Sequence, residues 1–110
     1  MIADLLEIAR RIRVLRGQFV LPDVDLAELF CVSPRHLSEV VRGDNSELPD
    51  VFVMAMQSAD AQDERLAFTE HGVIMAAAAL NDPYAVEMSI QIVRAFVKLR
   101  ETESARLDVQ

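Results

Sequence analysis

The sequence predicts a small α+β domain, rich in helices, with short β-hairpins and a long C-terminal helix. Three observations predict this class. Two short amphipathic segments flank a tight turn over residues 25–43, runs of β-forming residues surround turns within 12–21 and 51–68, and apolar residues recur at helical spacing over 83–102. The chain has 110 residues, of which 52% are hydrophobic, which is enough for one core but not for two.

One domain is therefore expected over residues 1–103, followed by a frayed tail over 104–110. At the start of the chain, apolar residues at helical spacing predict an amphipathic helix that could dock on a partner. Its expected apolar residues are Ile2, Leu5, Leu6, Ala9 and Ile12. A hairpin around Gly17 is expected next, and Pro22 ends it. Asp23 is then expected to cap the following helix.

The segment 25–43 predicts two short helices joined by a tight turn. Ala27 is small enough to let the two backbones approach, Ser33 can cap the second helix, and Pro34 suits its first turn. Cys31 occupies the turn position at which glycine is usual. The apolar contacts expected between the two helices come from Leu26, Ala27, Phe30, Val32, Leu37 and Val40. This outline is that of a helix-turn-helix, and its alternative is an ordinary packed helix pair.

If this unit binds DNA, its second helix would lie in the major groove. The helix side chains expected to reach bases or phosphates are Ser33, Arg35, His36, Ser38 and Arg42. Arg13 and Arg16 of the first hairpin would grip the phosphate backbone. Glu39 could accept a hydrogen bond from cytosine or repel the backbone, so both interpretations stay open.

The second half of the chain predicts two strands at 51–56 and 65–68 around an acidic loop, 57–64, after a polar loop over 44–50. Thr69 can cap a helix that ends at Leu80, and Asp82 with Pro83 in its first turn begins the last helix. This helix, expected to end near Thr102, carries apolar residues on two sides. Because a small domain has few elements to cover both, the pattern favours a homodimer.

Net charge is −7, and the acidic residues concentrate in the middle of the chain. Residues 1–43 carry six basic and six acidic groups, whereas residues 44–88 carry one and nine. Acidity opposes indiscriminate nucleic-acid binding, since such binding depends on neutralising phosphates. A local basic face is still expected to form, from Arg10, Arg11, Arg13, Arg16, Arg35 and Arg42.

Several other classes of function are not favoured. A single cysteine, expected as a small core residue, stands with only His36 and His71, so we expect no metal or other cofactor. No apolar run approaches a membrane span, and Asp4 stands where a secretory signal would carry lysine, so a cytoplasmic protein is expected. The carboxylates are scattered and there is no phosphate-binding glycine loop, which predicts no enzyme; His71 is expected to be partly buried at a helix start.

Five separate blocks, which from the first to the last span roughly nine-tenths of the chain, resemble in their order a phage and prophage domain family related to the KilA-N and Bro N-terminal domains, known as the open-reading-frame-six N-terminal domain. The blocks are 12–21 with its Arg16-Gly17-Gln18 turn, 25–30, 48–52, 67–73 and 92–101. The resemblance implies a small α+β DNA-binding domain of phage origin, in proteins regarded as transcription regulators or antirepressors.

The sequence departs from the family pattern at Cys31, at the short basic run Arg42-Gly43, and in the brief acidic segment between the two later strands. Two hypotheses follow. In the first, the protein is a dimeric DNA-binding regulator. In the second, it is an antirepressor or inhibitor that captures another protein through an acidic surface containing Asp60, Asp63 and Glu64.

Overall fold

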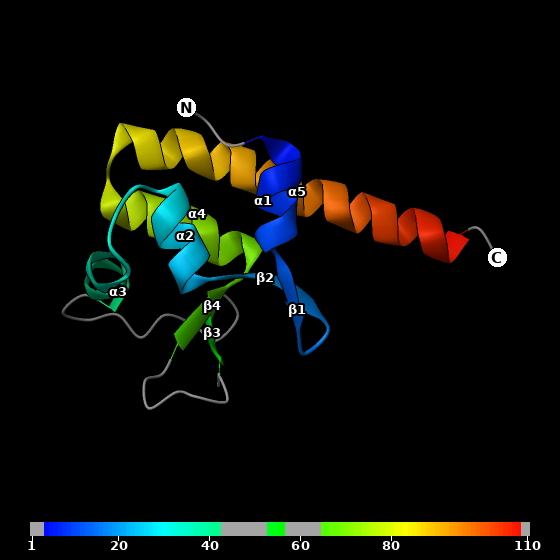
Figure 1. The fold of residues 1–110 in the computed structure, drawn as a ribbon, viewed down its shortest axis with the longest axis horizontal. Coiled ribbons are helices and arrows are strands. Elements are labelled where there is room, and N and C mark those ends of the chain that lie inside the picture. Colours follow the sequence, from blue (N-terminus) through cyan, green and yellow to red (C-terminus); the bar gives the residue numbers. More distant parts are fainter. Residues whose placement is uncertain (1–3, 43–52, 57–64, 109–110) are drawn as a thin grey trace.

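The computed structural model describes residues 4–42, 53–56 and 65–108 and confirms the predicted α+β class (Figure 1). In chain order the elements are α1 (Leu5–Arg11), β1 (Arg13–Leu15), β2 (Gln18–Pro22), α2 (Asp23–Leu29), α3 (Pro34–Arg42), β3 (Val53–Met56), β4 (Arg65–Phe68), α4 (Glu70–Leu80) and α5 (Pro83–Asp108). In Figure 1, α4 and α5 lie above the strands, α1 crosses α5, and the end of α5 extends beyond the other elements.

The four strands form one antiparallel sheet in the order β1-β2-β4-β3, so both predicted hairpins are confirmed. Leu21 of β2 pairs with Phe68 of β4, and both side chains lie in the main core. Val20 and Ala67 belong to a second, smaller buried cluster. The buried centre of the sheet therefore anchors both hairpins. The predicted loops at 44–50 and 57–64 lie outside the described residues.

Helix α1 is capped by Asp4, whose carboxylate accepts a hydrogen bond from the Glu7 backbone N–H at 2.8 Å. Its fully buried residue is Ile8, which the predicted apolar stripe omitted. Leu6, which that stripe included, is 62% exposed. The correction has a simple cause: Leu5, Ile8, Ala9 and Ile12 follow the spacing of one helix face, whereas Leu6 lies off that face.

Asp23 does not cap α2 as predicted. Pro22 is the N-cap residue of this helix, and no side chain accepts a hydrogen bond there. Asp23 is the first helical residue, and its Oδ2 accepts a hydrogen bond from the Leu66 backbone N–H of β4 at 3.3 Å. Its other oxygen, Oδ1, is buried without a hydrogen-bond partner among the described residues. The carboxylate thus joins α2 to the sheet.

The predicted cap of α4 is confirmed, because Thr69 Oγ1 accepts a hydrogen bond from the Gly72 N–H at 3.2 Å. Asn81 ends this helix in the left-handed region, with φ of 51°. Asp82 then accepts a hydrogen bond from the Tyr84 N–H at 3.4 Å, close to the start of α5. These local signals fix the tight connection between the two helices.

Helix α5 extends to Asp108, beyond the predicted end near Thr102. Both α4 and α1 pack against it, and Ile92, Ala95 and Phe96 of α5 are buried. The two neighbours that its apolar sides require therefore lie within the same chain. The predicted homodimer would therefore have to use the part of α5 that α1 and α4 leave exposed, which includes Val86 and Ile90.

Candidate nucleic-acid interface

The turn between α2 and α3 closes with backbone hydrogen bonds. The Val32 N–H donates to the Ala27 carbonyl at 3.0 Å, and the Cys31 N–H donates to the Glu28 carbonyl at 3.1 Å. Cys31 has φ of 59°, the left-handed conformation that glycine usually supplies after a helix. The predicted tight turn is thus present, with a cysteine at its strained position.

Cys31 is exposed, so the prediction that it is a core residue is wrong. A residue that adopts the left-handed conformation after a helix lies in the turn, so its side chain points away from the helix face that packs in the core. The Cys31 thiol lies close enough to the Tyr84 hydroxyl to be the main cause of the raised pKa of Tyr84. The contact links the turn to the start of α5.

Helix α3 begins as predicted, with Ser33 Oγ accepting a hydrogen bond from the His36 N–H at 3.0 Å. Leu37 and Val41 are buried and hold α3 on the main core. Val40, predicted to make this contact, is only partly buried. Because Val41 follows Leu37 by one helical turn, these two residues define the buried face.

The opposite face of α3 is exposed, and it carries Arg35, His36 and Glu39. The Arg35 side chain is 90% exposed and that of Glu39 is 64% exposed. Arg35 Nε donates to Glu39 Oε1 at 3.2 Å, one helical turn away. An exposed pair at this spacing contributes about 0.3–0.5 kcal/mol, so a ligand can compete for either partner at little cost.

The remaining predicted contact residues of this unit are Ser33, Ser38 and Arg42. Ser33 is exposed at the start of α3, Ser38 is partly buried, and Arg42 occupies the last turn of the helix. The sequence therefore groups five of its seven predicted site residues on one short helix and its cap.

The other two predicted site residues lie on the first hairpin. Arg13 is exposed on β1, and Arg16 forms the two-residue turn with Gly17. Both turn residues have positive φ, 52° at Arg16 and 78° at Gly17, as a tight hairpin turn requires. Figure 1 shows α3 at one end of the view and the β1–β2 turn on the other side of the β3–β4 hairpin, with all three below α4 and α5.

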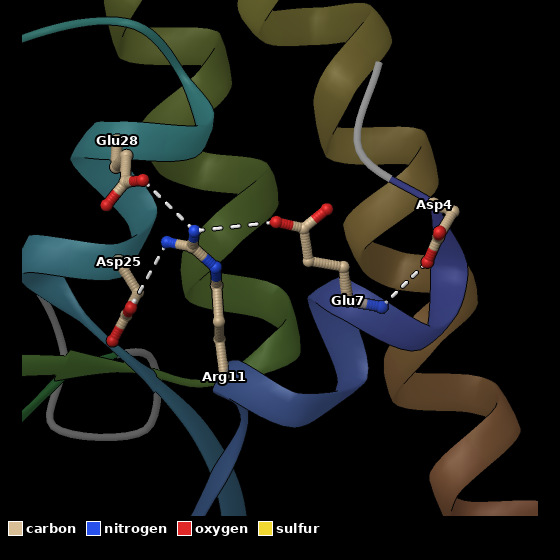
Figure 2. Close-up of polar contacts among 5 residues, drawn as sticks. All are labelled: Asp4, Glu7, Arg11, Asp25 and Glu28. Carbon is tan, nitrogen blue, oxygen red and sulfur yellow. Dashed lines mark hydrogen bonds and ion pairs between the residues drawn. The ribbon is translucent and has the colours of Figure 1, made fainter. Parts of the chain in front are cut away.

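Arg11 was predicted to join the basic face, but the structure places it in an ion-pair network between α1 and α2 (Figure 2). Its guanidinium lies 3.0 Å from Glu28 Oε1, 3.3 Å from Asp25 Oδ1 and 3.9 Å from Glu7 Oε1. The hydrogen bond with Glu28 raises the pKa of Arg11 and lowers the pKa of Glu28. Arg11 therefore joins α1 to α2, and its charge is not available to a polyanion.

A cavity of about 370 Å³ lies between the β1–β2 turn, the start of α4 and α5. Phe19 and Phe96 supply apolar lining, and Glu70, His71 and Arg100 supply polar lining. Arg100 Nη1 lies 2.8 Å from Glu70 Oε1, so the charges on its wall compensate each other. His71 is exposed, which corrects the prediction that it is partly buried.

A membrane-spanning helix and a group of metal ligands are both absent from the described residues. No helix in residues 4–42, 53–56 and 65–108 is long and apolar enough to cross a membrane. In the same residues, no three His, Cys, Asp or Glu side chains are grouped so as to hold a metal ion. The acidic residues Asp60, Asp63 and Glu64 lie outside this part of the chain.

The structure is that of a small α+β protein in which two short helices, α2 and α3, are joined by a tight turn, with one face of α3 buried and the other exposed. No family model, curated protein or solved structure matches the chain. The resemblance to the phage domain family therefore stays a prediction.

Proposed function

We propose that this protein is a DNA-binding transcription regulator whose α3 enters the major groove. The observation that carries the proposal is the division of α3 into two faces. Leu37 and Val41 fix one face in the core, while Arg35 and His36 stand exposed in the first turn of the other. The N-terminal half of a recognition helix is the part that contacts base edges in helix-turn-helix proteins.

The first hairpin supports the proposal as a contact to the phosphate backbone. No ion pair among the described residues involves Arg13 or Arg16, and both are exposed. The turn presents Arg16 at no further cost in backbone conformational entropy, because the pairing of β1 with β2 already fixes the backbone. Phosphate contacts of this kind fix the register of a protein on the duplex.

Net charge of −7 restricts how the protein binds. Repulsion between an acidic protein and DNA lowers non-specific affinity, so base contacts must supply a larger share of the binding free energy. The expected protein is thus a selective binder of low non-specific affinity. The resemblance supports a phage or prophage origin and a regulatory role, and non-enzymatic, cytoplasmic action remains part of the proposal.

We further propose a homodimer, for which the outer face of α5 is the candidate surface. Val86 and Ile90 are 46% and 52% exposed, and the partly buried Val93 and Val97 continue the same stripe. The spacing of these four residues, four, three and four, is that of a seam between two packed helices. A two-fold dimer would present two copies of α3 to half-sites about 34 Å apart.

The proposal is tested by fluorescence-anisotropy titration of labelled duplexes drawn from a randomised pool, at low salt. Arg35→Ala combined with Arg42→Ala removes two cations from α3 and is expected to weaken binding at least tenfold. The matched control, Arg94→Ala with Lys98→Ala, removes two exposed cations from α5 and should change binding much less. No binding at low salt, or equal effects of both pairs, would overturn the proposed function. Capture of a protein instead of DNA would favour the antirepressor hypothesis.

A further inference from the structure

We propose that Glu39 sets the base preference of α3: it holds Arg35 in position to read guanine, while its own free oxygen reads a nearby cytosine. The preferred site then has G·C pairs beneath the N-terminal half of α3. This inference rests on the proposed function, because it requires α3 to lie in the major groove.

The first step is the geometry of the Arg35 guanidinium. Glu39 Oε1 accepts from Nε of Arg35 at 3.2 Å, which occupies the side of the guanidinium nearest its own chain. The two terminal nitrogens, Nη1 and Nη2, are left for another acceptor pair. Guanine presents N7 and O6 together in the major groove, and a guanidinium fork fits this pair with two parallel hydrogen bonds.

The second step concerns the other carboxylate oxygen of Glu39. The side chain is 64% exposed, and only Oε1 is used by Arg35. Cytosine is the base whose major-groove edge offers a hydrogen-bond donor, N4–H, without an acceptor beside it. A carboxylate placed against thymine O4 or guanine O6 would face another acceptor and would lose its water without compensation.

The third step is the charge that Glu39 adds to this face. By pairing with Arg35 it removes most of the net attraction of this part of α3 for phosphate. The affinity for DNA of arbitrary sequence is therefore low. Tight binding requires that Arg35 and Glu39 both form hydrogen bonds with bases at the same time. Discrimination comes from the penalty on wrong sequences as much as from the contacts with the right one.

The test uses Glu39→Gln, which keeps the length of the side chain and a neutral acceptor for Arg35 Nε but removes the charge. Wild-type protein first selects duplexes from a randomised pool. Dissociation constants are then measured over a salt series for a selected duplex and for one in which the selected guanine pair is changed to A·T. Wild type is expected to prefer the selected duplex by about tenfold or more.

Glu39→Gln is expected to bind both duplexes more tightly at low salt, with a preference at least threefold smaller than that of wild type. The dependence of log K on log salt should steepen by about one, because the charge of Arg35 is no longer neutralised by a neighbouring carboxylate and can act on a phosphate. Arg35→Lys should lose the preference with little change in salt dependence, since lysine lacks the guanidinium fork.

The matched control is Glu101→Gln, which makes the same charge change at an exposed position of α5. It should leave the sequence preference unchanged, and circular dichroism should show equal helix content in all variants. If wild type binds selectively and Glu39→Gln keeps the full preference, this inference is overturned and the proposed function stands. If wild type, Glu39→Gln and Glu101→Gln bind no duplex at low salt, the proposed function is overturned, and this inference with it.

Discussion

The arginines of this chain differ in what surrounds each guanidinium, and this decides what each can do. Arg11 is 22% exposed and faces carboxylates of α1 and α2, so its charge is used within the fold. Arg35 is 90% exposed beside a single glutamate, so its charge remains accessible to a ligand. The same residue type is therefore structural at one position and a candidate contact at the other.

Arg11→Ala is expected to lower the free energy of unfolding by about 1–2 kcal/mol, between the values for a surface and a buried ion pair. The loss arises because Asp25 and Glu28 remain close together without their cation. Urea unfolding followed by circular dichroism measures it. Arg10→Ala, the exposed neighbour on α1, is the control and should change stability by no more than about 0.5 kcal/mol.

Glu28 gives this network a pH dependence. Its pKa is lowered by the hydrogen bond and charge of Arg11, so the folded state binds this proton more weakly than the unfolded state does. The stabilisation is complete above the ordinary glutamate pKa of about 4.3 and is lost as the pH falls through the lower pKa of the folded state.

Urea midpoints measured between pH 6 and pH 3 should therefore fall less steeply in Glu28→Gln than in wild type, because the variant has no carboxylate to protonate at this position. Parallel curves for the two proteins over this range would contradict the role given to Glu28.

At the scale of elements, Ala27 is the small residue expected to let α2 approach α3 closely. Ala27 is fully buried in the first helix of the pair, and its carbonyl accepts the hydrogen bond that closes the turn. A larger side chain would force the two helices apart. The orientation of α3, and hence of Arg35, depends on this packing.

Ala27→Leu is expected to destabilise the protein by about 1–3 kcal/mol through overpacking. Val24→Leu, in the same helix at a position 39% exposed, should change stability little. Thermal unfolding of both variants provides the comparison. Equal melting temperatures would show that the helix crossing tolerates bulk at Ala27.

Local signals predicted the elements of this fold well. The Ser33 and Thr69 caps, the glycine hairpin turn and the helix pair each depend on residues only a few positions apart, and all are present. Ile8 also follows a local pattern, since it lies on the face shared by Leu5 and Ala9, and closer attention to the helical period identifies it.

Contacts between distant segments could not be predicted in the same way. Asp23 looked like a helix cap, yet it accepts a hydrogen bond from Leu66, 43 residues away. Arg11 looked like part of a basic face, but its partners Asp25 and Glu28 lie 14 and 17 residues along the chain. Both contacts depend on how α1, α2 and the sheet pack together, which no local spacing encodes.

For the whole molecule, the apolar stripe on α5 makes oligomeric state a direct prediction. Light scattering coupled to size-exclusion chromatography should give twice the mass of one chain. Ile90→Glu places a charge on the seam and should give a monomer that binds DNA at least tenfold more weakly. Ile74→Glu, a matched change at an exposed position of α4, should remain dimeric. A monomeric wild type would remove the dimer from the proposal.

The most direct test of the account is an NMR titration of the protein with a selected duplex, in which backbone amide shifts show the surface that DNA contacts. The largest shifts are expected at residues 33–39, which are the Ser33 cap and the first part of α3, with a second group at the Arg16-Gly17 turn. Shifts confined to α4 and α5, with residues 33–39 unchanged, would contradict it.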